Sequence, residues 1–94
     1  MYVKSEYGAL VNLNKANGVY VSRENAPMGC EQIVADFGKS ERNYTLATYD
    51  NINDALFAIT VLGQYVRDKA KYATMDHIRL IVETDETDEE DVEK

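Results

Sequence analysis

Hydrophobic and polar residues divide the chain into short alternating segments followed by one long apolar segment. Five short segments are predicted to be strands: residues 1–4, 9–13, 18–23, 31–37 and 44–49. Apolar side chains alternate in 9–13 and 18–23 and weakly in 1–4, the period of a strand with one buried face, and 31–37 and 44–49 are predicted to form a strand pair. Residues 55–66 then run for twelve positions without a charge. This pattern predicts an α+β fold in which an antiparallel sheet of four to five short strands packs against one long helix.

Turn and capping residues separate these segments. Residues 6–8 contain a glycine that is free to take a positive φ, which predicts a turn. The pair Asn17-Gly18 predicts a hairpin between the second and third strands, since Asn-Gly is a strong two-residue turn signal. Asp50 or Asn51 is a suitable N-cap for the helix, and Asp54 lies in the first turn, where a carboxylate is favoured.

The long helix carries two apolar stripes when it is plotted at about 100° per residue. The wider stripe is predicted to face the sheet; it comprises Ile52, Ala55, Leu56, Ile59, Leu62, Gly63, Val66 and Ala70. The narrower stripe, on the opposite side, consists of Phe57, Val61 and Tyr65. An apolar strip with polar neighbours is typical of a contact surface. We therefore expect this stripe to form a protein interface, first in a homodimer with isologous symmetry. The alternative is that loops or a C-terminal strand cover it.

The C-terminal region admits two structures before it becomes too polar to pack. Ile78, Leu80 and Val82 alternate with other residues, which predicts a final strand, and a continued helix is the alternative. Residues 84–94 are almost all acidic or threonine and are predicted to be disordered. The expected organisation is a single α+β domain over residues 1–83 and an acidic tail over 84–94.

The net charge of −7 is located entirely in the tail region. Residues 83–94 hold eight acidic groups and one lysine, so the rest of the chain is electrically balanced. A balanced body argues against direct nucleic-acid binding, which needs a basic surplus. The tail has three interpretations: a solubilising terminus, a charge that steers the protein toward a basic partner, or a DNA mimic.

Composition also indicates the compartment. The chain has no apolar run of about 18 residues and no apolar signal-peptide segment at its N-terminus. Its single cysteine, Cys30, suits a reducing environment. We therefore expect no membrane association and a cytoplasmic location.

No residue pattern predicts catalysis, a metal site or a cofactor. One cysteine and one histidine are too few for a metal site, and the glycines are scattered singly rather than grouped in a phosphate-binding loop. Cys30 with His77 would be the only nucleophile pair, and a half-buried thiol with a surface imidazole is the simpler interpretation. By the usual criteria for a catalytic site, we expect a protein that is not an enzyme.

Seven tyrosines and no tryptophan are the chain's most unusual compositional feature. Tyrosine is common at contact surfaces and also in cross-strand pairs. If some of these residues bind a small nucleotide signal, the candidates are tyrosines with a nearby arginine: Tyr20 with Arg23, and Tyr49 with Arg42 or Arg79.

Residues 9–70 resemble small proteins of the phages and prophages of Gram-positive bacteria. The resemblance rests on a VNLN segment, strands like GVYV and TLATY, and the helix-start pattern formed here by Asp50, Ala55 and Leu62. It implies no catalytic residues. It implies a phage-encoded inhibitor that binds a bacterial host protein or a component of anti-phage defence. The alternatives are a sponge that sequesters a nucleotide signal and a structural oligomerisation module.

Overall fold

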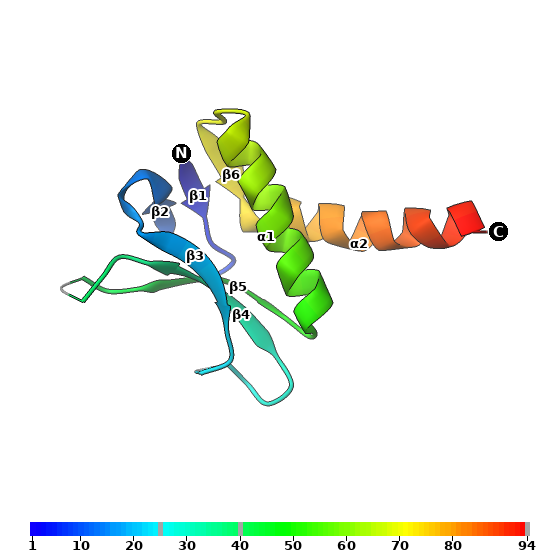
Figure 1. Ribbon diagram of the computed structural model, residues 1–94, viewed down its shortest axis with the longest axis horizontal. Helices are drawn as coiled ribbons and strands as arrows, with labels where there is room; N and C mark the ends of the chain where they lie inside the picture. Colours follow the sequence, from blue (N-terminus) through cyan, green and yellow to red (C-terminus); the bar gives the residue numbers. More distant parts are fainter. Residues whose placement is uncertain (25, 40, 94) are drawn as a thin grey trace.

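Two three-stranded sheets and two α-helices form the described part of the computed structural model (Figure 1). The structure describes residues 1–24, 26–39 and 41–93, with side chains up to residue 84. The α+β class is therefore confirmed, although the strands are divided between two sheets and a second helix is present. The elements are β1 (Tyr2–Lys4), β2 (Leu10–Asn12), a 3-10 turn η1 (Leu13–Lys15), β3 (Gly18–Ser22), β4 (Glu31–Asp36), β5 (Tyr44–Tyr49), α1 (Ile52–Arg67), β6 (Tyr72–Thr74) and α2 (Met75–Glu93).

The smaller sheet pairs the first two strands of the chain with the last one. Its order is β2-β1-β6, with β1 antiparallel to β2 and parallel to β6. The predicted turn between β1 and β2 is present: Gly8 has a φ of 90°, and the buried Ser5 hydroxyl accepts hydrogen bonds from the amides of Tyr7 and Ala9. Strand β6 was not predicted, because three residues are too few to show an alternating pattern.

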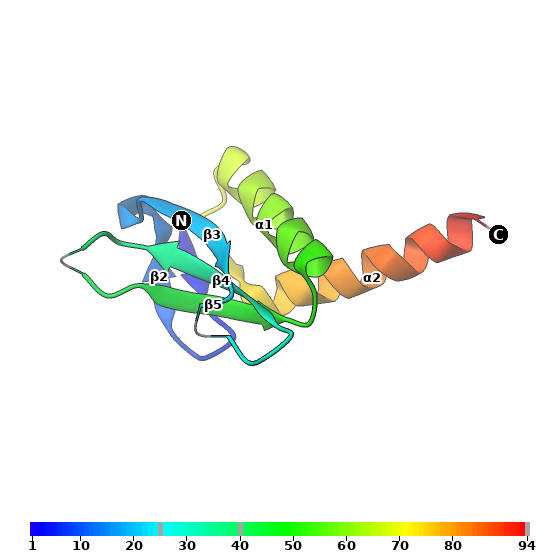
Figure 2. The same ribbon diagram turned by 60° about the horizontal axis from the view of Figure 1, so that its bottom comes forward.

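The larger sheet is the antiparallel meander β3-β4-β5. Helix α1 lies across one face of it, as Figure 2 shows. The inward-facing residues of the sheet include the small side chains Ala35 and Ala47 beside Ile33, all fully buried. All five predicted strands are present in the structure. β1 and β2 bury only their central residue, whereas β4 buries three consecutive residues.

The predicted hairpin at Asn17-Gly18 is wrong. β2 ends in the 3-10 turn η1, and β3 pairs with β4 rather than with β2. A two-residue type I′ turn needs positive φ at both positions, and neither Asn17 nor Gly18 has one. The Asn17 amide instead donates to the Asp36 carbonyl at 2.7 Å, so the chain changes sheets at this point.

Helix α1 begins as predicted and ends in an unpredicted turn. The Asn51 side chain accepts from the Asp54 amide at 2.8 Å and donates back to its carboxylate at 3.1 Å. At the other end, the amides of Lys69 and Ala70 donate to the carbonyls of Val66 and Tyr65, which is a Schellman motif. Lys69 occupies its left-handed position, with a φ of 61°.

The predicted orientation of α1 is only partly correct: Ala55 and Leu62 of the predicted core stripe are buried. The face assigned to the core leaves Ile52, Leu56 and Val66 exposed by 37%, 50% and 53%. The buried stripe is rotated from the predicted one toward Ala58 and Val61; its members are Ala55, Ala58, Val61 and Leu62. Two alanines on the helix, Ala55 and Ala58, belong to the same buried cluster as Ala35 and Ala47 on the sheet. Leu56 and Val66, two larger apolar residues of the predicted core stripe, lie on the exposed flank of the helix.

Helix α2 replaces the predicted final strand. Met75, Ile78 and Val82 are fully buried at helical spacing, whereas Leu80, which should have shared their face in a strand, is 58% exposed. The alternative of a helix in this region is therefore correct. The backbone of α2 continues through residues 84–93, and in Figures 1 and 2 it projects away from the body. Residues 84–94 were predicted to be disordered, whereas the structure gives 84–93 a helical backbone; residue 94 lies outside the described residues. Neither α1 nor the described part of α2 is long and apolar enough to cross a membrane.

Candidate functional site

A polar cluster around Arg79 fastens α2 to both sheets. The guanidinium donates to both carboxylate oxygens of Glu6, with Nη2 at 2.8 Å from Oε1, and to the carbonyl of Thr48. Glu6 lies in the β1–β2 turn and also accepts from the Thr48 amide at 3.3 Å. The Glu6 hydrogen bonds raise the pKa of Arg79 above its ordinary value, so the side chain keeps its charge. Because Glu6 and Arg79 satisfy each other, we interpret this cluster as a structural clasp.

Tyr49 lies under the same guanidinium and is almost fully enclosed. Arg79 Cζ is 4.2 Å from the ring centroid, a cation–π contact, and the residue is only 2% exposed. Its hydroxyl has no hydrogen-bond partner among the described residues. Burial raises the pKa of Tyr49 to about 12, against the opposing effect of Arg79. The ring is therefore part of the core and offers no open face to a ligand.

The structure does not bring the five predicted nucleotide-binding residues together. Tyr49 and Arg79 meet, but they stack on each other inside the molecule. Arg42 precedes β5 whereas Tyr49 ends it, so the strand's length, roughly 17 Å, separates them. Tyr20 lies on β3, and the Arg23 guanidinium is 2.7 Å from the buried carboxylate of Glu31. The pairing with Glu31 also raises the pKa of Arg23.

Cys30 and His77 belong to different parts of the fold. Cys30 lines a pocket of about 540 Å³ between the β3–β4 loop and the start of α1, together with Asn51 and Ile52. His77 lies exposed in the first turn of α2, where its amide donates to the Thr74 hydroxyl at 3.1 Å, and it does not line this pocket. Within the described part of the chain, no group of three or more His, Cys, Asp or Glu residues could hold a metal ion.

The two outer strands of the larger sheet differ in how their edges are covered. On β5, the Glu6 amide donates to the Leu46 carbonyl at 2.8 Å, and the Glu6 carboxylate accepts from Thr48. On β3, Gly18–Ser22 makes no backbone hydrogen bond other than those of its ladder with β4, as far as the described residues show. An uncovered edge presents unpaired N–H and C=O groups to other chains. β3 is such an edge.

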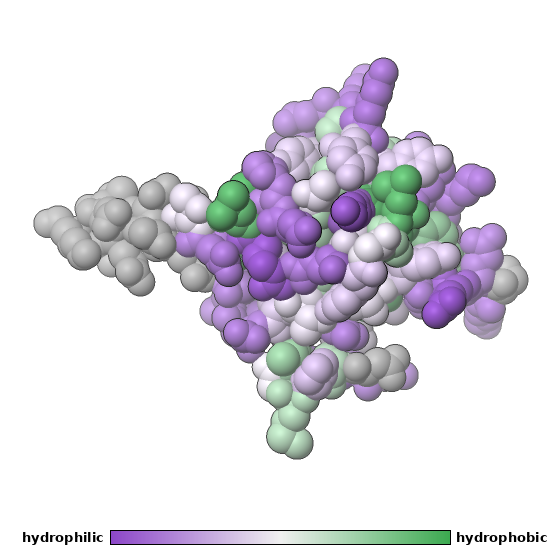
Figure 3. Space-filling view, turned by 180° about the vertical axis from the view of Figure 1, so that it is seen from behind, coloured by the Kyte–Doolittle hydropathy of each residue, from purple (hydrophilic) through white to green (hydrophobic). Residues whose placement is uncertain are grey.

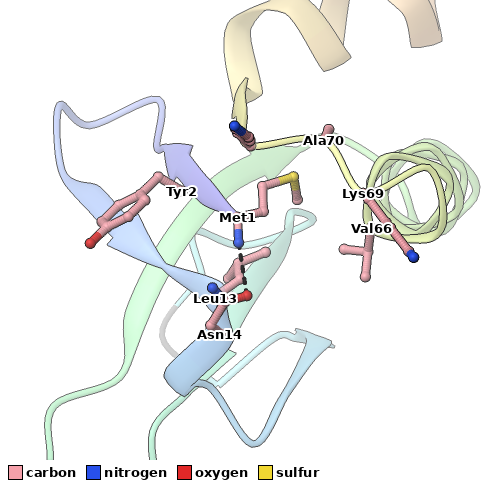
Figure 4. Close-up of a pocket in the computed structure, with 8 residues that line it drawn as sticks. Met1, Tyr2, Leu13, Asn14, Val66, Lys69 and Ala70 are labelled. Carbon is pink, nitrogen blue, oxygen red and sulfur yellow. Dashed lines mark hydrogen bonds between the residues drawn. The ribbon is translucent and has the colours of Figure 1, made fainter.

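The exposed flank of α1 runs along this open edge. At the end of the helix, Val66 shares a pocket of about 550 Å³ with Leu13 and Asn14, which precede β3 (Figure 4). At the start of the helix, Ile52 shares the other pocket with Arg23 and Pro27, which follow β3. The helix is therefore antiparallel to β3 and turns this flank toward its edge.

We call the combined surface the β3–α1 face. It consists of the edge of β3 and the α1 flank, where Gly63 leaves room between the larger side chains: Gly18–Ser22, Ile52, Leu56, Gly63 and Val66. A Cβ added to Gly63 would have no atom within 4 Å. Figure 3 shows the molecule from behind, where hydrophilic and neutral residues dominate and the green patches are small and separate. The β3–α1 face combines backbone groups and apolar side chains, the two requirements for strand addition.

The residues predicted for a protein interface lie on the other side of α1. Val61 is 6% exposed, and Phe57 and Tyr65 pack half-buried against the core. Val61 is therefore covered within the single chain, as in the alternative to an interface. The exposed flank was missed because Leu56 and Val66 are larger than the alanines that face the sheet. The signal that identifies the buried stripe is the run Ala55, Ala58, Leu62 and Tyr65, which also has helical spacing.

Comparisons with protein-family models, with curated proteins and with solved structures find no match to this chain. Its geometry is therefore the basis for the functional proposal.

Proposed function

We propose that this chain is a small non-enzymatic binding protein that acts by protein contact through the β3–α1 face. The observation that carries the proposal is the open edge of β3 beside an exposed apolar helix flank. Such an edge pairs with an extended segment of another protein chain, whose apolar side chains then cover the flank. In the inhibitor role implied by the resemblance to phage proteins, contact with a bacterial protein blocks that protein's own interactions.

The arrangement of the polar side chains supports contact rather than catalysis. Among the described residues, Arg79 and Glu6 are held by each other and Arg23 by Glu31. The residues of the β3–α1 face are apolar, small or hydroxyl-bearing and carry no charge. A neutral apolar surface gains binding free energy from removing its area from water.

Immobilised full-length chain and a lysate of a Gram-positive bacterium test this proposal. We expect one bacterial protein to bind saturably, and its binding to fall at least about tenfold for Leu56→Glu, because the interface would then bury an unpaired carboxylate. Leu80→Glu is the matched control, since Leu80 is an exposed leucine on the other helix. Equal binding of the identified protein to both variants would remove the β3–α1 face from the proposal.

A further inference from the structure

We infer that a second copy of this chain occupies the β3–α1 face, with the two β3 strands paired antiparallel about a two-fold axis at Tyr20. This inference rests on the proposed function, since it names the partner that the same face binds in the isolated protein. It joins two three-stranded sheets into one sheet of six strands.

The sequence of β3 is self-complementary in this pairing. The strand reads Gly-Val-Tyr-Val-Ser, so it places similar residues at equal distances from its centre. An antiparallel copy centred on Tyr20 sets Val19 opposite the second copy's Val21, and Gly18 opposite the second copy's Ser22. Valine pairs and a central tyrosine pair are favourable cross-strand neighbours. This symmetry favours a second copy of β3 over a strand of another protein as the partner.

Charges at the ends of β3 agree with the same register. Lys15 precedes the strand and Glu24 follows it. Antiparallel pairing brings Lys15 of each copy to the end where the second copy's Glu24 lies, so opposite charges meet at both ends. Arg23 reaches the same end, and its guanidinium is already held by Glu31 at 2.7 Å. Within β3 itself no charged or proline residue blocks the approach of another strand.

The apolar flank of α1 lies on the side of the sheet to which β3 turns its valines. Val19 and Val21 are partly buried and pack against the core beneath the helix. The two-fold axis therefore brings both exposed flanks over the junction of the two sheets, one on each side. Leu56 and Val66, half exposed in the single chain, lose water contact there. The dimer accounts for apolar residues that have no role in the monomer.

The mass of the full-length protein in solution tests the dimer. Light scattering across concentrations up to about 100 µM should give twice the chain mass of 10.6 kDa. Leu56→Glu and Tyr20→Lys should each raise the dissociation constant at least about tenfold, through a buried charge and a charged strand edge. Leu80→Glu and Tyr72→Lys, at exposed positions elsewhere, should leave the mass unchanged. A wild-type monomer, or equal dissociation constants for all four variants, overturns the inference.

A crosslink tests the register independently of affinity. In a Cys30→Ser background, Tyr20→Cys should form an intermolecular disulfide with oxidised glutathione, since the axis sets the residue opposite itself. Tyr72→Cys is the control and should form no intermolecular disulfide. Failure of Tyr20→Cys to crosslink overturns the strand pairing.

The dimer and the proposed function fail in different ways. A monomeric wild type that still loses its bacterial partner through Leu56→Glu contradicts the dimer alone. A dimer dissolved by Leu56→Glu, with binding to the bacterial protein unchanged, contradicts the proposed function of the face and leaves the dimer standing.

Discussion

Lys69 holds a backbone conformation that favours glycine. Its φ of 61° belongs to the left-handed position of the Schellman motif that ends α1. A residue with a side chain is destabilised there by roughly 1 kcal/mol relative to glycine. Glycine offsets part of this gain because it raises the conformational entropy of the unfolded chain. We expect Lys69→Gly to stabilise the protein by about 0.5 kcal/mol, a rise of about 2–4 °C in Tm by calorimetry.

Lys71 supplies the control for that substitution. It lies two residues later and has no positive φ. Lys71→Gly should therefore lower Tm, since only the entropy term remains. A lower Tm for both variants would contradict the strain assigned to Lys69.

Tyr49 is expected to lower the free energy of unfolding at alkaline pH. Its pKa of about 12 in the folded protein exceeds the ordinary value of 10.0. The folded state thus holds the phenol proton where the unfolded state has lost it. The resulting stability is complete below pH 10 and falls as pH rises toward 12, by up to roughly 2–3 kcal/mol.

Tyr49→Phe separates this effect from the other tyrosines. The hydroxyl has no partner among the described residues, so its removal should cost little at pH 7 or even stabilise. Urea unfolding at pH 7, 9 and about 11 should show a smaller alkaline loss for Tyr49→Phe than for wild type. Parallel losses would contradict the assignment of Tyr49.

At the scale of the elements, strands were easier to predict than helix orientation. The strands β1 to β5 are short apolar segments between turn signals, which are visible in the sequence, although β4 and β5 also bury adjacent residues. Helix α1 has two overlapping apolar stripes, and residue size pointed to the wrong one: Leu56 is exposed and Ala58 buried. What decides between them is packing in the cluster that also contains Ala35 and Ala47 of the sheet, which no local pattern reveals.

The clasp of Arg79 was unpredictable for the same reason. Glu6 and Arg79 are 73 residues apart in sequence, and neither has a local signal. Helix α2 over residues 78–82 was first assigned to a strand, because Ile78, Leu80 and Val82 also fit a two-residue period. The β3–α1 face is formed by two elements that are distant in sequence, so no sequence motif marks it.

The clasp is predicted to stabilise the attachment of α2. Arg79→Lys keeps the charge and loses the two-oxygen geometry with Glu6. We expect a loss of about 1–2 kcal/mol in urea unfolding, and Arg67→Lys, at an exposed position on α1, should change little. A double-mutant cycle with Glu6→Gln should give a coupling of about 1 kcal/mol. Strict additivity would contradict a direct interaction.

For the whole molecule, charge is concentrated on α2. The last turn of this helix has no basic residue, and residues 83–94 hold eight acidic groups. Like charges four residues apart, and negative charges at a helix C-terminus, both oppose helix formation. We expect far-UV circular dichroism to show increasing helicity as pH falls from 7 toward about 4. A chain ending at residue 83 should lack this increase, and an equal increase in that chain would contradict the assignment.

The parallel pairing of β1 with β6 has a consequence for how the chain folds. β1 is the central strand of its sheet, yet one of its two neighbours begins at Tyr72. During synthesis, β1 cannot pair with β6 until residues 72–74 have been made. Contacts of such long sequence separation slow folding. The Glu6 amide that covers the edge of β5 lies between β1 and β2, so it can pair before β6 is synthesised. Only the smaller sheet therefore stays incomplete until residue 72 has been made, with one edge of β1 open to other chains.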